Sequence, residues 1–198
     1  MSLLLGLAPF AGFFAVMRLV SPMAGLVAAL AISALLCIWM HRRGKSIKIL
    51  EIGSLLLFAS LVLYTWVALP EWTVATVRLA VDGGLLAIVL VSLAIGTPFT
   101  IQYAREQVPR QYWDSPHFLA ANRLISAAWA GAFAVLVAAD AAAEYLSSIP
   151  LWIDVTASIA AFSAALGFTI RYPAIVRGRA QSASARSGEA RSGSDVPQ

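Results

Sequence analysis

The chain has 198 residues, of which 60% are hydrophobic and only 12% are charged, and its mean hydropathy is +0.81. A soluble domain carries about 25% charged residues and less than half apolar residues, so the composition excludes a soluble globule. It predicts an all-α integral membrane protein, and because most of the basic residues behind the net charge of +4 gather at one membrane face, nucleic acid is a poor candidate partner.

Six apolar stretches have about the length that crosses a bilayer. A hydrocarbon core of about 30 Å needs roughly 20 helical residues at about 1.5 Å each. Prolines or charged turns separate the stretches, as expected where a helix must end. The sequence therefore predicts a six-transmembrane-helix bundle over residues 1–172, with spans Leu3–Val20, Met23–Met40, Ile49–Leu69, Val74–Gly96, Leu119–Ala139 and Leu151–Tyr172. The first stretch has no basic side chain before it, which favours a retained helix over a cleaved signal peptide.

Basic residues predict the orientation of the bundle. Twelve of the 14 lie at one predicted face, and only Arg18 and Arg78 lie elsewhere. By the positive-inside rule that face is cytoplasmic, which places both termini inside (N-in/C-in). Residues 173–198 lack apolar periodicity and are predicted to form a disordered cytoplasmic tail. The protein is expected to pass through the lipid bilayer several times.

Arg78 and Asp82 form the candidate intramembrane polar site. They lie four residues apart on the fourth span, so they share a helix face and are expected to form a hydrogen-bonded pair inside the bundle. Charged residues inside a bilayer are costly and often functional. Two interpretations stay open: a site for a substrate, ion or proton, or an internal salt bridge that fixes the rotation of the helix.

Asp140, Glu144 and Asp154 form an acidic group at the outer ends of the last two spans. Paired carboxylates can perform acid–base chemistry or hold a cation. The expectation favoured here is a solvated interfacial group with Arg18 at the same level. Glu51, near Lys48, is likewise expected to be an ordinary interfacial residue.

The segment 97–123 mixes aromatic side chains, both charge signs and three prolines. Phe99 and Tyr103 are one turn apart and are expected in the headgroup region, with arginines directed toward phosphates. The segment is a candidate docking surface for a protein or a lipid, or else a kinked extension of the fourth helix. Its candidate docking residues are Phe99, Tyr103, Arg105, Glu106, Pro109, Trp113, Asn122 and Arg123.

Small residues recur at four-residue spacing on the last two spans. Such faces let helices approach closely in lipid, so a tight antiparallel pair is expected. These residues are Ser126, Ala130, Ala134 and Ala138 on one helix, and Ala157, Ala161 and Ala165 on the other.

The sequence contains no motif for nucleotide hydrolysis, thiol redox chemistry or zinc proteolysis. One cysteine and two separated histidines are too few for a usual zinc site. We therefore assign no catalytic, cofactor-binding or metal-binding residue, and we expect the protein not to be an enzyme.

The stretch Glu106-Gln107-Val108-Pro109, followed by Trp113, Asn122, Trp129 and Phe133, resembles the intracellular septation protein A family. Leu7-Ala8-Pro9-Phe10, Phe13-Phe14 and the basic turn at Arg42-Arg43 are similar to that family as well. The resemblance implies a non-enzymatic inner-membrane protein that maintains septation and the cell envelope through membrane-protein partners. It carries over no catalytic residue.

Two functional hypotheses follow from these observations. The first is the envelope protein that docks partners of the envelope or division machinery. The second is a small transporter or channel, as a monomer or homo-oligomer, that uses Arg78 and Asp82 as its intramembrane site.

Overall fold

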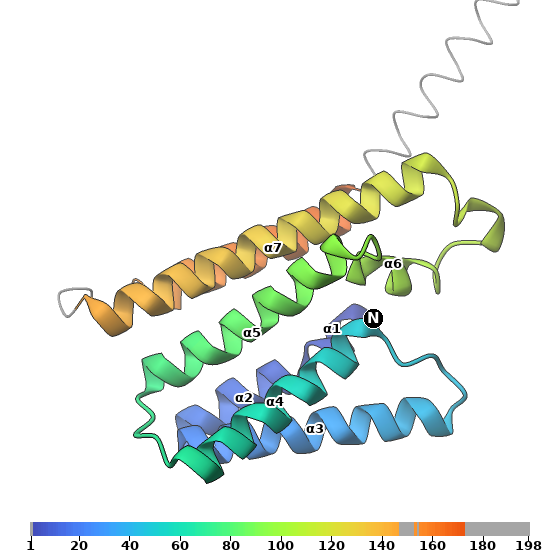
Figure 1. The fold of residues 1–198 in the computed structure, drawn as a ribbon. Helices are drawn as coiled ribbons and strands as arrows, with labels where there is room; N and C mark the ends of the chain where they lie inside the picture. Colours follow the sequence, from blue (N-terminus) through green and yellow to red (C-terminus); the bar gives the residue numbers. More distant parts are fainter. Residues whose placement is uncertain (1, 147–152, 154, 173–198) are drawn as a thin grey trace, which may run out of the picture.

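The computed structural model describes residues 2–146, 153 and 155–172 of the chain, and Figure 1 shows that their regular structure is helical throughout. The predicted turn at 147–150, the start of the sixth span at Leu151, Asp154 and the tail from Pro173 lie outside these residues. Five helices are long and apolar enough to cross a membrane: α3 (Pro22–Arg42), α4 (Ile49–Ala68), α5 (Val74–Ala94), α7 (Pro116–Tyr145) and the last helix, Val155–Tyr172. The chain is thus a helical protein of the multi-pass membrane type.

The first predicted span is divided into two helices. Residues Ser2–Gly6 form α1 and residues Ala8–Leu19 form α2, with Leu7 between them. Pro9 lies in the first turn of α2, where its missing N–H does no harm, but it cannot continue a helix that enters from α1. Twelve residues of α2 cover only about 18 Å, so the expectation of one continuous helix over 3–20 is wrong.

The next three predicted spans are confirmed with small changes at their ends. Ser21 begins α3 by accepting a hydrogen bond from the Ala24 N–H at 3.2 Å, and Thr73 caps α5 through the Thr76 N–H at 2.9 Å. Both are the short hydroxyl residues that satisfy free N–H groups at a helix start. Helix α5 ends before Gly96, whose φ of +75° is the left-handed conformation that glycine adopts without strain.

After Gly96 the chain turns back onto the bundle. Residues Phe99–Ala104 form the short helix α6, and Arg110–Tyr112 form the single turn η1. The segment is therefore not a kinked extension of α5. Helix α7 then extends six residues beyond the predicted end at Ala139 and finishes at Tyr145.

Consecutive long helices run in alternating directions, so their loops gather at two ends of the bundle. One end, which we name the basic end, holds the loop between α3 and α4 together with α6, and the N-terminus lies beside it (Figure 1). The other, which we name the opposite end, holds the α2–α3 and α4–α5 turns. Helix α5 packs against α4 on one side and α7 on the other, which makes it the central helix.

Aromatic rings fill the core, and aliphatic side chains cover the outer surface. Phe13, Phe58, Trp129 and Phe133 are fully buried, and the rings of Phe10 and Phe58 lie 5.2 Å apart. Large apolar side chains point outward along the long helices, as expected where lipid replaces water. They include Leu35, Leu56, Leu63, Trp66, Val91 and Ile159.

The small-residue stripe predicted for α7 is only partly correct. Ser126 and Ala130 are buried, but Ala134 is exposed. Helix α7 and the last helix meet instead through rings, with Trp129 and Phe162 centroids 5.1 Å apart. The Trp129 indole N–H also donates to Thr169 at 2.9 Å.

Close packing of α2 on α3 requires a glycine at position 25. A Cβ there would lie 3.0 Å from the Phe13 carbonyl oxygen and 3.1 Å from the Met17 nitrogen, and these backbone atoms cannot swing aside. A Cβ at Gly83, inside α5, meets nothing within 4 Å. We expect Gly25→Ala to destabilise the protein by about 1–3 kcal/mol through overpacking. Gly83→Ala should be neutral or stabilising by up to about 1 kcal/mol because alanine favours helix.

Thermal unfolding of the two variants in the same detergent measures this difference. Equal melting temperatures for Gly25→Ala and Gly83→Ala would show that α2 and α3 are not packed as described.

Candidate functional site

Arg78 of α5 joins three other helices. Its Nη2 lies 2.8 Å from Oδ1 of Asp140 on α7, and the same nitrogen donates to the Ser158 hydroxyl on the last helix at 3.5 Å. Its guanidinium carbon lies 5.8 Å from the centroid of the Phe14 ring on α2. The side chain is only 8% exposed, so this is a buried charge held between helices.

Asp140 is the main correction to the predicted site. We expected it in a solvated interfacial group, yet its exposed fraction is 0%. Because α7 continues to Tyr145, Asp140 lies within the helix on the face that packs against α5. Glu144, one turn further, accepts hydrogen bonds from Thr73 and Thr76 at 2.9 Å each. Asp154 lies outside the described residues.

Asp82 lies one turn from Arg78 on the same face of α5 and is 1% exposed. The direct Arg78–Asp82 hydrogen bond stays a prediction; the 2.8 Å ion pair joins Arg78 to a different helix. Arg78, Asp82 and Asp140 together form what we call the Asp–Arg–Asp cluster. It lies about 6–12 Å from the start of α5, at about 1.5 Å per residue.

Arg78 and Asp82 of the cluster line a groove of about 550 Å³. Phe10, Ala11 and Phe14 of α2 form one wall, and Ile159 and Phe162 of the last helix form the other. Arg78, Asp82 and Leu85 of α5 form the floor, and Arg18 lies at the end of the α2 wall. Pockets that hold small molecules have volumes of about 300–1,000 Å³ and combine apolar walls with a few polar groups, so the groove has the size and character of a binding site.

A second group of charges holds the basic end together, and the sequence did not predict it. Lys48 forms an ion pair with Glu106 at 2.9 Å, while its backbone N–H donates to Glu51 at 2.7 Å. The hydroxyl of Tyr103 donates to the other oxygen of Glu51 at 3.1 Å. Glu51 is therefore a buried link between α4 and α6, and not the interfacial residue that we expected.

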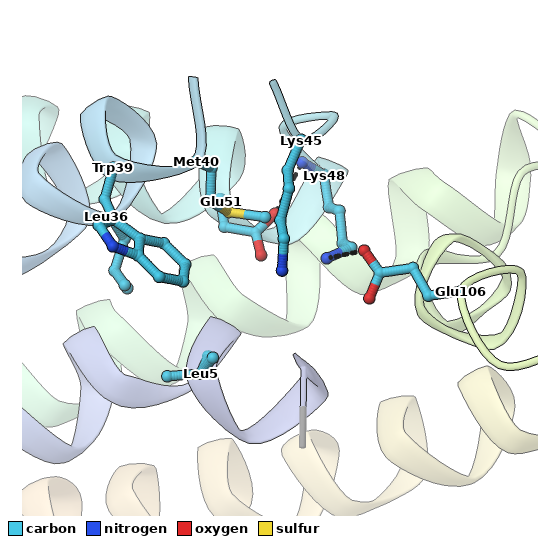
Figure 2. A pocket seen from close by; sticks show the side chains of 8 residues that line it. All are labelled: Leu5, Leu36, Trp39, Met40, Lys45, Lys48, Glu51 and Glu106. Atoms are coloured by element: carbon cyan, nitrogen blue, oxygen red, sulfur yellow. Dashed lines mark hydrogen bonds and ion pairs between the residues drawn. The ribbon is translucent and has the colours of Figure 1, made fainter. Parts of the chain in front are cut away.

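Figure 2 shows the small cavity beside these residues, with Trp39 and Met40 on one side and Lys48 and Glu106 on the other. Its volume of about 30 Å³ is close to the room that one water molecule occupies in the liquid. The group of Lys48, Glu51, Tyr103 and Glu106, which we call the basic-end cluster, is thus too closely packed to hold a larger ligand.

Burial raises the pKa of Tyr103 well above its usual range, and the neighbouring carboxylates of Glu51 and Glu106 raise it further. The phenol stays protonated and remains a hydrogen-bond donor at physiological pH. Its role in the structure is to hold Glu51.

The predicted docking residues divide into a buried and an accessible group. Phe99, Tyr103 and Asn122 are buried, so the expectation of Phe99 and Tyr103 in the headgroup region is wrong. Thr100 contributes to the burial of α6, because its hydroxyl donates to the Asn122 carbonyl at 3.0 Å and lies 2.8 Å from the Ser126 hydroxyl. These contacts tie α6 to α7. The partly or fully exposed residues are Arg105, Glu106, Pro109, Trp113 and Arg123.

Trp113 lies between two arginines. The guanidinium carbons of Arg105 and Arg110 lie 5.1 and 5.4 Å from its ring centroid, and its indole N–H donates to the Val108 carbonyl at 2.8 Å. These contacts hold the turn after α6, in which Arg110 is exposed and Arg105 is half-buried. Within the part of the chain that the structure describes, no three histidine, cysteine, aspartate or glutamate residues gather as a metal site.

Breaking the Arg78–Asp140 pair should be costly because it leaves a buried charge. We expect Arg78→Ala to lower the free energy of unfolding by about 3–5 kcal/mol. The Arg78→Ala/Asp140→Ala double variant should recover part of that loss, since it also removes one of the two buried carboxyl groups that the guanidinium stabilises. Thermal unfolding in detergent compares them, and a double variant as unstable as the sum of both single variants would contradict the pairing.

The chain matches no known protein family, no curated protein and no solved structure.

Proposed function

We propose that the protein is a small membrane transporter that moves an amphipathic, lipid-like molecule through the groove between α2 and the last helix. The observation that carries the proposal is the position of Arg78 and Asp82 on the floor of a largely apolar groove, with Asp140 paired to Arg78 behind them. An unpaired charge at the centre of a bilayer costs about 2.5–3.5 kcal/mol on insertion scales and about 10–17 kcal/mol in simulations. A salt bridge that only stabilised the fold could be buried away from any cavity, whereas Arg78 of this pair lines the groove.

The walls and the floor suit the two parts of an amphipathic molecule. Apolar side chains of α2 and the last helix can contact acyl chains, while Arg78 and Asp82 supply charge and hydrogen bonds to a head group. The α2 wall runs from Leu7 to Arg18, about 16 Å at about 1.5 Å per residue, which is half of a bilayer core. A head group that follows this wall passes Arg78 and Asp82 and travels about half the thickness of a bilayer core.

The transport proposal predicts faster movement of lipid between leaflets. In liposomes that contain the protein, dithionite should bleach a fluorescent phospholipid of both leaflets, whereas in protein-free liposomes it reaches only the outer leaflet. Ala11 is exposed and lines the groove, so Ala11→Trp should fill it and remove most of the acceleration. Ala15 is equally exposed on α2 but does not line the groove, which makes Ala15→Trp the matched control.

If the parent protein bleaches no more lipid than empty liposomes, the transport proposal fails. Equal loss of activity in Ala11→Trp and Ala15→Trp would remove the groove as the pathway.

We propose further that the basic end faces the cytoplasm of a bacterial inner membrane and that α1 and α2 together form the first of six spans. The loop after α3 carries Arg42, Arg43 and Lys45, as the positive-inside rule requires of a cytoplasmic loop. Helices α1 and α2 together cover 2–19, about 27 Å at about 1.5 Å per residue.

Reporter fusions test this topology. Fusions at Gly44 and Ser115 should show cytoplasmic activity, and a fusion at Ser148 should show periplasmic activity. Periplasmic activity at Gly44 would reverse the orientation, and cytoplasmic activity at Ser148 would contradict the number of spans.

A second candidate function is a non-enzymatic role in septation or envelope maintenance through membrane-protein partners. The observation that favours it is the accessible part of the α6–α7 connection, where Trp113 lies between Arg105 and Arg110 and Arg123 is exposed. The role itself is inferred from the resemblance to the intracellular septation protein A family.

Proximity labelling from the basic end distinguishes this second function. A ligase fused after the last residue should label division or wall-synthesis proteins, and Arg105→Glu/Arg110→Glu should reduce that labelling severalfold. Labelling of abundant membrane proteins alone, unchanged by the substitutions, would count against it.

A further inference from the structure

The charges of the Asp–Arg–Asp cluster do not balance. Arg78 supplies one positive charge, while Asp82 and Asp140 supply two negative charges if both are ionised. All three side chains are more than nine-tenths buried, with exposed fractions of 7%, 1% and 0%. A net negative charge in so apolar an environment is expensive, because the attraction to one guanidinium must offset the desolvation of two carboxylates.

No other charge at this depth restores the balance among the described residues. On α7, Glu144 lies one turn away and is bound by Thr73 and Thr76. On α4, the ionisable side chains are Glu51 and Tyr64, near the two ends of the helix. On the last helix, from Val155, the ionisable groups are Arg171 and Tyr172, at the far end. On α2, Arg18 lies at the end of the groove and is exposed, whereas the three residues of the cluster are buried.

Both aspartates are within reach of the same guanidinium. Asp140 contacts Arg78 at 2.8 Å, and side chains four residues apart on a helix are neighbours, with Cβ atoms about 5–6 Å apart. Two carboxylates that share a buried site do not both ionise readily, and the pair then titrates as a unit.

We propose that Asp82 and Asp140 hold one shared proton beside Arg78, which makes the floor of the groove a proton-binding site. The proton is carried as an O–H bond on one carboxyl oxygen, and the cluster is then electrically neutral. Asp82 and Arg78 line the groove, so the proton has a route to and from the site. A cationic head group that reaches the floor replaces this proton, which couples transport to proton movement. That coupling rests on the proposed function; the bound proton does not.

Infrared spectroscopy of the full chain in liposomes reads the proton directly, with no transported molecule present. A protonated carboxyl has a C=O stretch that ionised carboxylates lack. We expect this band at pH 7, shifted when the aspartates carry ¹³C. In Asp82→Asn, and equally in Asp140→Asn, the remaining carboxylate is balanced by Arg78 and ionises, so the band should disappear in both.

Arg78→Gln should have the reverse effect. Without the guanidinium, both aspartates should become protonated and the band should grow about twofold. Glu144→Gln and Arg18→Gln are the controls and should leave the band unchanged. Loss of the band in Arg18→Gln or Glu144→Gln would contradict the proposal, because it would show that the proton is not held by the two aspartates alone.

Absence of the band from the parent protein across pH 6–8 would overturn the proposal, and so would a band that survives in both Asn variants. The parent measurement decides the question even where a variant does not fold. Because the spectrum is recorded without lipid movement, a failed lipid assay with the band present rejects the transport function and leaves the proton site.

Discussion

The ion pair between Arg78 and Asp140 is the interaction on which the arrangement of the second half of the bundle depends. It links the central helix α5 to α7 at 2.8 Å, and Arg78 also reaches Ser158 on the last helix. Apolar packing in lipid has little preference for one helix rotation over another, because lipid solvates apolar faces as well as protein does. A buried ion pair does have such a preference, since any rotation that separates the charges leaves them in hydrocarbon. The pair therefore fixes which faces of α5 and α7 meet, and the groove lies where the remaining faces diverge.

The helical spans could be predicted from the sequence because the length of an apolar run follows from the thickness of a bilayer. The predictions for α3, α4 and α5 are within about two residues at each end. The two errors have a common cause. Pro9 divides the first span in the middle of an apolar run, and α7 continues past the end of its apolar run to include Asp140. Hydropathy alone therefore predicts neither the break in the first span nor the full length of α7.

The candidate site was half predictable. Arg78 and Asp82 attract attention because charges are rare inside a span, and their helical spacing places them on one face. Asp140 lies 58 positions beyond Asp82, and only the packing of α7 on α5 brings it to the same place. The basic-end cluster was missed for a related reason. Each of its residues is ordinary at a membrane interface, and the burial of Lys48, Glu51 and Tyr103 results from the return of α6 onto the bundle. Hydrophobic periodicity along the sequence carries no signal for such a return.

The last helix has a different relation to its surroundings from the other helices. Only 6% of its residues are buried within the protein. Its described contacts with α7 lie along one side, where Phe162 meets Trp129 and Phe133. In a membrane, lipid acyl chains would therefore contact most of this helix, including the side that faces away from the groove. A helix held by so few protein contacts can change its tilt with the thickness of the bilayer, and the groove wall formed by Ile159 and Phe162 would move with it.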